Sequence, residues 1–393
     1  MPQNILVLNT GSSSVKFAVF DAALTEILHG QAEGIGTDAG RLTCGDHDIT
    51  RPLPDHATAL EAVLDALAEA GIDRDQLAAA AHRVVHGGAT LKEACEITPD
   101  VRAQIEAAVP LAPLHNPHAL SGIDAISRHA PGLAQFASFD TAFHATNPDI
   151  ATTYAVPAEV TARGIRRYGF HGTSYAALMR RWADVTGTNL PARVLAFHLG
   201  NGASACAILN GRSVATTMGY SPLEGLTMGT RAGQIDANAV LRLAEEDGID
   251  ATRTLLNNQS GLKGLSGGLS DMRALGQAGT AEAQFAIDHF CHWAVRHAGS
   301  LVAAMGGVDA VVFTGGIGEN DAYVRGAILG GLSFLGLRPD SEANTAKATQ
   351  LHHPKSRVAA WIIPADEERQ IALDAAKRLQ TFAFDPKQKV PPG

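Results

Sequence analysis

The chain has 393 residues, of which 40 are acidic and 31 are basic, so its formal net charge at pH 7 is −9. This surplus of negative charge argues against polyanionic partners, namely nucleic acids and anionic membrane surfaces. The length exceeds that of a usual single hydrophobic core, so we expect two domains.

Residues 5–20, with the sequence ILVLNTGSSSVKFAVF, predict two β-strands that meet at a tight loop. Residues 5–8 are continuously apolar, as in a strand buried on both faces, and apolar side chains alternate along the second strand. The loop combines Gly11, three serine hydroxyls and the nearby charge of Lys16, which suit an anion such as phosphate. An ordinary serine-rich hairpin turn is the alternative interpretation.

The following elements place an arginine at the end of a strand. Apolar residues between 60 and 67 have the spacing of an amphipathic helix, and residues 79–85 predict a short strand that ends in a His-Gly-Gly turn. Arg83 therefore lies near a strand end, where open α/β sheets bind ligands. Three prolines make residues 110–117 a rigid loop, and a helix is expected over residues 117–129.

An aspartate follows the next strand. Residues 134–139 predict that strand, and Asp140 comes directly after it. A carboxylate at this position can take part in chemistry or bind magnesium, whereas a capping aspartate is the alternative. Residues 166–172 then gather basic and aromatic side chains ahead of a helix that begins near Ser174.

Residues 194–209 repeat the pattern of the opening hairpin, because two apolar strands again flank a glycine-bearing loop. His198 follows Asn9, and Gly200 follows Gly11, by the same 189 residues (198 − 9 and 200 − 11). This repetition indicates a duplicated domain. Two such domains would offer one hairpin loop each to a polyphosphate.

We expect the domain boundary shortly after His144. The N-terminal domain would comprise residues 1–146 and the C-terminal, nucleotide-binding domain residues 147–367. A final helix at about residues 368–393 would pack back on the N-terminal domain.

Two glycine-rich loops follow in the second half. Residues 218–234 form a long loop that we expect to carry Arg231 into a site, although a surface arginine is the alternative. Residues 264–271 form another loop, which leads directly to Asp271 and Arg273.

The last third contains a strand, a glycine loop and a helix start in succession. After a long helix over residues 281–305, the strand at 308–314 runs into Gly315–Asn320. Bare backbone at such a loop lets an anion or nucleotide approach the helix N-terminus. A strand at 358–364 then precedes Asp366-Glu367-Glu368, whose carboxylates either offset a helix dipole or hold a metal.

The cysteines and the start of the chain bear on its cellular location. Cys44, Cys95, Cys206 and Cys291 have no C-x-x-C spacing, which excludes a zinc cluster and argues against a disulfide framework. No basic and apolar leader precedes the first strand, and no apolar run reaches the about 18 residues that span a bilayer. We therefore expect a soluble, unprocessed protein of the reducing cytoplasm.

The sequence lacks a P-loop, a Rossmann fingerprint and the protein-kinase motifs, so those three classes are excluded. Its motifs resemble those of the acetokinase family, in the same order and nearly from end to end. The segments that carry the resemblance are NTGSSSVKF (9–17), HRVVHGG (82–88), FDTAFH (139–144), YGFHGTS (168–174), HLGNGAS (198–204), PLEGLTMGTRAG (222–233), FTGGIGEN (313–320) and DEERQIA (366–372).

The resemblance implies an α/β fold with two duplicated ribonuclease-H-like domains of the actin-like ATPase type and an active-site cleft between them. It implies reversible phosphoryl transfer from ATP to acetate, giving acetyl phosphate and ADP. Mg²⁺, which Mn²⁺ can replace, would be the metal, and the protein would be a cytoplasmic homodimer.

The resemblance also implies roles for individual residues. Asn9 and Glu367 would be associated with magnesium, Arg83 would bind the substrate carboxylate, and Asp140 would be the catalytic carboxylate. His171 and Arg231 would stabilise the transferring phosphoryl group. The acid's methyl group would contact Val85, Leu114 and Pro222, and the nucleotide would contact Ser12, Ser14, Lys16, His198, Leu199, Gly200, Asn201, Gly202, Asp271, Met272, Arg273, Gly316, Ile317, Gly318, Glu319 and Asn320.

Two positions depart from the expected patterns. The wider superfamily has an aspartate where this chain and the acetokinases have Asn9, so Asn9 would act on magnesium indirectly. The last motif has Ala365 before its acidic residues, where the family usually has Thr or Asn, which weakens the assignment of Glu367.

The implied chemistry is consistent with these side chains. Phosphoryl transfer requires positioning and neutralisation of charge on three equatorial oxygens. Acetate is already a nucleophile, which favours direct in-line transfer and a role for Asp140 in organising magnesium or Arg83 rather than in taking a proton. A propionate or butyrate kinase is the nearest alternative, and a non-catalytic ATP-dependent clamp is a more distant one.

Overall fold

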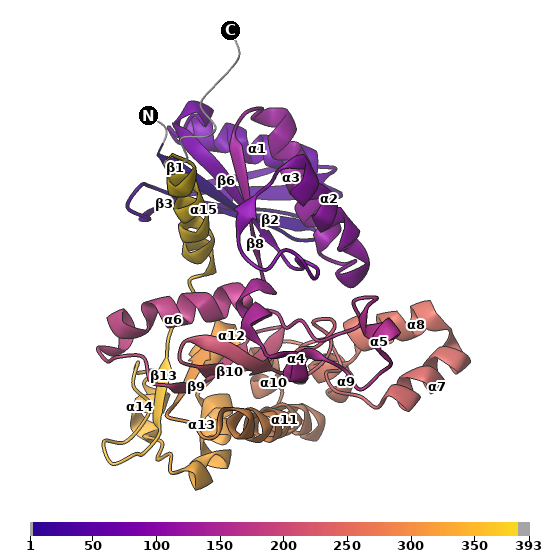
Figure 1. Cartoon of the computed structure of the whole chain (residues 1–393), viewed down its shortest axis with the longest axis vertical. Coiled ribbons are helices and arrows are strands. Elements are labelled where there is room, and N and C mark those ends of the chain that lie inside the picture. The colour runs from indigo at the N-terminus through magenta and orange to yellow at the C-terminus, as the bar shows by residue number, and fades with distance from the viewer. Residues whose placement is uncertain (1–2, 384–393) are drawn as a thin grey trace. The chain divides into compact units, whose positions relative to one another are not determined.

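The computed structural model describes residues 3–383, so the part of the expected final helix beyond residue 383 lies outside the described residues. The chain forms two compact units (Figure 1). Unit 1 comprises residues up to Ala142 together with those from Asp366 onward, and unit 2 comprises Phe143–Ala365.

The described residues of unit 1 build one sheet of eight strands in the order β5-β4-β3-β2-β1-β6-β8-β7. Strands β1 to β5 pair antiparallel in succession, whereas β6 and β8 continue the sheet parallel to β1. The strand bounds are β1 Asn4–Thr10, β2 Ser14–Phe20, β3 Glu26–Glu33, β4 Thr37–Cys44, β5 His47–Leu53, β6 Leu77–Val84, β7 Cys95–Glu96 and β8 Ala134–Phe139.

Helices cover both faces of this sheet. Alternate residues of β1 point to opposite faces, so Leu6 and Leu8 pack in the core with α1, His56–Glu69, and α3, Asn116–His129. Ile5 and Val7 pack instead with α15, Glu367–Ala383, which lies on the other side of the sheet (Figure 1). The continuous apolar run of β1 is thereby explained, because both of its faces are buried. Within the described part of this unit, the remaining helices are α2 Pro99–Ala107 and two short 3₁₀ segments at Arg74–Gln76 and Val109–Leu111.

Unit 2 contains a five-stranded sheet, within the described residues, in the order β11-β10-β9-β12-β13. The order and the strand directions match those of β3-β2-β1-β6-β8 in unit 1. Both ends of β9 and of β10 follow the ends of β1 and β2 by 189 residues (193 − 4, 199 − 10, 203 − 14 and 209 − 20). The bounds are β9 Arg193–Leu199, β10 Ala203–Leu209, β11 Arg212–Thr216, β12 Ala310–Thr314 and β13 Ala359–Ile362.

Two helices enclose the sheet of unit 2. Helix α6, Gly172–Thr186, buries Tyr175 and Trp182 against the strands, and α11, Ala281–Met305, contacts β9, β10 and β11. The connection from β11 to α11 holds several further helices. The other helical segments are 3₁₀ Ala142–Thr146, α4 Asp149–Thr152, α5 Ala158–Thr161, α7 Ala237–Asp247, α8 Ile249–Thr254, a π-helical turn Leu255–Gln259, α9 Gly261–Leu265, α10 Met272–Ala278, α12 Gly315–Asn320, α13 Ala322–Gly331, 3₁₀ Ser333–Leu335 and α14 Ser341–Thr345.

The structure confirms the α/β class with two sheets, and the shared strand order is consistent with the predicted duplication. None of the helices within residues 3–383 is long and apolar enough to cross a bilayer.

Candidate functional site

In unit 1, the ends of three neighbouring strands bring Asn9, Arg83 and Asp140 together. Because β1, β6 and β8 are parallel, their carboxyl ends share one edge of the sheet. Arg83 donates from Nε and Nη2 to the two oxygens of Asp140 at 3.0 and 2.6 Å, and from Nη1 to Asn9 Oδ1 at 3.4 Å. Asp140 is only 2% exposed. The bidentate pairing fixes the guanidinium plane at the sheet edge.

Carboxylates from the start of α15 add negative charge to this cluster. Burial disfavours the charged form of Arg83, but Asp140, Glu367 and Glu368 more than offset that effect and raise the pKa of Arg83. Burial also raises the pKa of Glu368, and Glu367 raises it further, whereas Lys16 and Arg83 lower it. Arg83 therefore remains cationic and able to bind an anion.

This cluster offers the oxygen ligands that a hard divalent cation prefers. Among residues 3–383 no group of three or more His, Cys, Asp or Glu side chains is arranged to hold a metal by itself. Magnesium typically uses one or two carboxylates and completes its shell with water and phosphate oxygens. Glu367 and the amide oxygen of Asn9 fit that kind of site better than they fit an all-protein cage.

The loop that follows Asn9 is a tight turn with exposed serines. The backbone N–H of Gly11 donates to the carbonyl of Ser14 at 2.8 Å, and Ser12 is exposed. Lys16 pairs with Asn9 across the β1–β2 ladder, and its side chain lines a cavity of about 490 Å³ together with Glu368. The loop can present hydroxyls and one ammonium group to an anion.

The two predicted contacts for the acid's methyl group in this unit differ in their surroundings. We expected Val85 on the same strand as Arg83, but β6 ends at Val84, so Val85 lies one residue beyond it and is half-buried. Leu114 is 52% exposed. A large exposed apolar side chain is available for contact with a ligand or a partner.

In unit 2, two histidines stack beside the end of β9. His171 has a left-handed backbone, with φ of 58°, directly before α6. Its ring centroid lies 4.1 Å from that of His198. Hydrogen bonds hold both rings, because His171 Nδ1 lies 2.8 Å from Ser204 Oγ and His198 Nδ1 lies 2.8 Å from Ser174 Oγ. A strained residue that is held in this way is typical of a functional site.

Arg231 lies next to the same histidine. A β-carbon added at Gly202 would be 3.4 Å from His171 Nε2 and 3.5 Å from Arg231 Nη1. Gly202 therefore lies against both groups, and its lack of a side chain allows them to approach each other. Arg231 Nη1 also donates to the carbonyl of Pro222 at 3.2 Å, and burial lowers the pKa of the guanidinium. The long loop therefore places Arg231 beside His171, where its side chain is half-buried.

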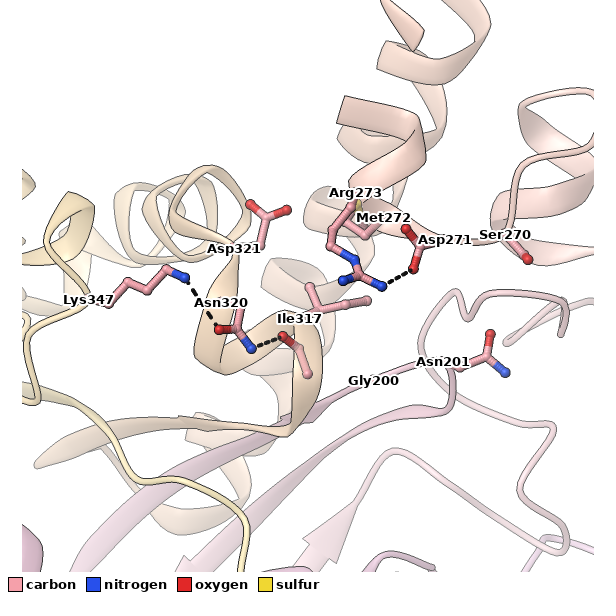
Figure 2. Close-up of a pocket in the computed structure, with 11 residues that line it drawn as sticks. Gly200, Asn201, Ser270, Asp271, Met272, Arg273, Ile317, Asn320, Asp321 and Lys347 are labelled. Atoms are coloured by element: carbon pink, nitrogen blue, oxygen red, sulfur yellow. Dashed lines mark hydrogen bonds and ion pairs between the residues drawn. The ribbon is translucent and has the colours of Figure 1, made fainter. Parts of the chain in front are cut away.

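A cavity of about 770 Å³ opens beside these groups in unit 2 (Figure 2). Three separate segments that the sequence predicted as nucleotide contacts meet in its wall. The predicted residues that line it are Gly200, Asn201, Asp271, Met272, Arg273, Gly316, Ile317 and Asn320. The cavity is large enough for a nucleotide.

Eight of the predicted nucleotide contacts lie outside this lining, five of them in unit 2 and three in unit 1. His198 stacks on His171, Leu199 is buried in β9, and Gly202 separates His171 from Arg231. Gly318 is buried, and Glu319 turns back to accept hydrogen bonds from the backbone N–H groups of Gly315 and Ala365, both at 2.9 Å. Ser12, Ser14 and Lys16 belong to unit 1.

The cavity is also lined by three residues that were not predicted from the sequence, namely Ser270, Asp321 and Lys347. Asp321 caps α13 by accepting from the N–H of Val324 at 2.9 Å, so a capping signal after the glycine loop could have identified it. Ser270 adjoins the predicted Asp271. Nothing in the sequence around Lys347 marks it as a cavity residue.

These features together define a class of protein. The sheet unit is duplicated, and glycine loops line a nucleotide-sized cavity next to a half-buried arginine and histidine. This is the architecture of an actin-like ATPase that transfers phosphoryl groups.

The comparisons with known proteins specify the family. The sequence model of the Acetokinase family matches residues 4–373, so the chain belongs to that family, whose members transfer phosphate to a carboxylate acceptor. It is 41% identical to an acetate kinase of Methylocella silvestris, over 98% of this chain and 100% of the relative.

Solved structures agree with this assignment. The crystal structure of Porphyromonas gingivalis acetate kinase has a TM-score of 0.89 and 36% identity, covering 96% of this chain and 100% of that one. A propionate kinase from Francisella tularensis has a TM-score of 0.90 and 37% identity, covering 95% and 98%.

The position of Glu319 leads to a prediction. Replacing Glu319 with alanine should remove the acceptor for two backbone donors and lower the free energy of unfolding by about 1–3 kcal/mol. Glu319→Gln should lose less, because one oxygen acceptor remains. Asn320→Ala, which changes an exposed cavity residue, should instead weaken ADP binding with little loss of stability. Chemical denaturation and calorimetric titration with ADP would measure both properties, and the opposite pattern would contradict this assignment of Glu319.

Proposed function

We propose that this chain transfers the γ-phosphoryl group of ATP to acetate, reversibly, and forms acetyl phosphate and ADP. The observation that carries the proposal is the Arg83–Asp140 pair at the sheet edge of unit 1. Asp140 and Asn9 accept from three of the five guanidinium N–H groups, as far as residues 3–383 show, so the cation retains capacity for a small carboxylate.

Unit 2 supplies the groups that the transferring phosphoryl needs. Arg231 and His171 flank Gly202, and both would neutralise charge that develops on the equatorial oxygens. Acetate needs no general base at neutral pH because its carboxylate is already ionised. Direct in-line transfer therefore requires Asp140 only to orient Arg83, and the short contacts between the two support that role.

Magnesium is the proposed metal, and manganese is the proposed substitute. Glu367 and Asn9 would hold it, with Asn9 acting through a water molecule. When bound, the ion would neutralise phosphate charge and orient the nucleotide. The oxygen-only donor set and the carboxylates at the start of α15 support this choice.

The cavity of unit 2 is the proposed nucleotide site. Its wall carries the backbone of Gly200 and Gly316, which lets a ligand approach closely. The hairpin residues Ser12, Ser14 and Lys16 are proposed as additional nucleotide contacts from unit 1. The other predicted residues of unit 2 do not line the cavity and would hold its wall in position, namely His198, Leu199, Gly202, Gly318 and Glu319.

The contacts of the acid's methyl group set which acid is used. Val85, Leu114 and Pro222 are the proposed contacts of the acid's methyl group, and the similarity to acetate kinases favours acetate. Propionate is a second candidate, because a solved propionate kinase is comparably similar in structure.

We also propose that the protein is a cytoplasmic homodimer. The four cysteines are free thiols, three of them buried, as expected for a reducing compartment. The family resemblance supports the dimer, and light scattering after size-exclusion chromatography would measure it.

A hydroxylamine trapping assay tests the function directly. Acetyl phosphate reacts with hydroxylamine to give acetohydroxamate, whose iron(III) complex is coloured. The assay can therefore compare acetate, propionate and butyrate with ATP, both with magnesium and after chelation. Acetate should give the highest kcat/KM, and chelation should abolish the signal. ATP hydrolysis without hydroxamate from any of the three acids would reject the proposal and favour an ATP-dependent clamp.

The proposed role of Arg231 predicts a large catalytic loss. Arg231→Ala should lower turnover by about 10³- to 10⁵-fold, because an arginine that stabilises the phosphoryl transition state contributes about that much. Arg242→Ala, which removes an exposed arginine on α7, is the matched control and should retain wild-type turnover. Near-normal turnover of a folded Arg231→Ala variant would remove this residue from the mechanism.

The proposed acid pocket predicts a shift in specificity. Val85→Ala should raise the kcat/KM for propionate relative to acetate by about 10-fold, chiefly through KM, since one methylene of space is worth about 1–3 kcal/mol. The KM for ATP should not change. Val101→Ala, at a half-buried valine of α2, serves as the control. An unchanged ratio in Val85→Ala would show that Val85 does not line the pocket.

A further inference from the structure

A buried arginine connects the glycine loop of the nucleotide cavity to a distant helix. Arg325 on α13 is fully buried, and burial lowers its pKa. It donates to the carbonyl of Gly318 at 3.0 Å, and to the side-chain and backbone oxygens of Asn344 at 2.8 and 2.9 Å. Asn344 in turn donates to the carbonyl of Ala322 at 2.7 Å. The guanidinium thus joins the ends of α12 and α14, whose last carbonyls attract a cation.

This connection positions Lys347. Helix α14 ends in a Schellman motif. In it, the backbone N–H of Lys347 donates to the backbone carbonyl of Asn344 at 3.2 Å, and the N–H of Ala348 donates to the carbonyl of Ala343 at 2.9 Å. Lys347 occupies the left-handed position of that motif, with φ of 53°. Glycine is the residue that usually stands there, because a side chain strains the backbone. At this strained position the side chain of Lys347 lines the nucleotide cavity.

Lys347 and Asn320 form a donor and acceptor pair in the cavity wall. The ammonium group of Lys347 lies 3.4 Å from Asn320 Oδ1, and Asn320 Nδ2 donates to the carbonyl of Gly316 at 2.9 Å. Because the amide nitrogen is used in this way, the amide oxygen must face Lys347 and the cavity. Figure 2 shows the two side chains pointing toward one another.

The pair lies at the end of the cavity opposite to the phosphoryl-transfer groups. Gly200 and Asn201 are on the other side of Figure 2, and the next residue, Gly202, adjoins His171 and Arg231. A nucleotide whose terminal phosphate lies near Arg231 therefore has its base near Lys347. Asp321 lies near Asn320 in Figure 2 but is engaged in capping α13, and Arg273 forms an ion pair with Asp271 at 3.6 Å.

We propose that Lys347 is a base-recognition residue, which acts with Asn320 on the polar edge of the nucleotide base. This inference rests on the proposed nucleotide site. An ammonium donor beside an amide acceptor matches adenine, through N1 and the 6-amino group, and equally matches hypoxanthine, through its 6-oxo group and N1–H. Lys347 therefore strengthens the binding of both bases and has no contact with the phosphates.

The experiment compares the affinities of ADP, IDP and inorganic tripolyphosphate, each with magnesium, by calorimetry on the full chain. Lys347→Gly should weaken ADP and IDP by about 10-fold each, since a hydrogen bond from a charged donor is lost, and should leave tripolyphosphate unchanged. Lys347→Arg, which keeps a cationic donor, should restore most of the loss. Lys355→Met, at an exposed lysine of the same segment, is the control and should match the wild type.

Two results would overturn the inference. An equal loss for tripolyphosphate and ADP would assign Lys347 to the phosphates, and unchanged ADP affinity in Lys347→Gly would remove it from the site. Glycine is favoured at this backbone position, so the variant should have a Tm at least as high as that of the wild type. Binding is measured without turnover, so the comparison stands even if the wild type forms no acetyl phosphate, a result that would reject only the proposed function.

Discussion

Parallel pairing at the centre of each sheet is the constraint on which the rest of this structure depends. In unit 1 the strands β1, β6 and β8 run in the same direction, and in unit 2 the strands β9, β12 and β13 do so. Parallel strands end at a common edge, so the residues at or just after their ends meet in space although they are far apart in the sequence. Asn9, Arg83 and Asp140 meet in this way, as do the loops after Leu199 and Thr314.

The protein binds anions with local features rather than with its overall charge. Its net charge of −9 would repel a polyphosphate at long range. In unit 2 the cavity wall instead combines glycine backbone with the side chains of Arg273 and Lys347, and Arg231 and His171 lie beside it. In unit 1 the cation at the sheet edge is Arg83, which pairs with Asp140 and is kept charged by nearby carboxylates. Neighbouring groups therefore hold each cationic side chain in a fixed position, and phosphoryl transfer requires such positioning.

Much of this arrangement could be predicted from the sequence, because the central strands are continuously apolar and their ends carry chemically distinct residues. The 189-residue repeat predicted both hairpins, and helix α11 has the predicted bounds. Strands β4 and β5 were not predicted, since β5 is exposed along six of its seven residues and has no alternating pattern. Lys347 was not predicted either, because its place in the cavity depends on Arg325 and a helix end, which no local pattern reveals.

The return of α15 to unit 1 has a consequence for synthesis on the ribosome. Unit 2 is inserted into unit 1, so the face of β1 that contains Ile5 and Val7 has no cover until α15 has been translated. At about 5–20 residues per second, roughly 20–70 s separate the first hairpin from that helix. During this time an apolar sheet face is open to chaperones and to aggregation. The same helix brings Glu367, so the nascent chain acquires the proposed metal ligand only when this face of the sheet is covered.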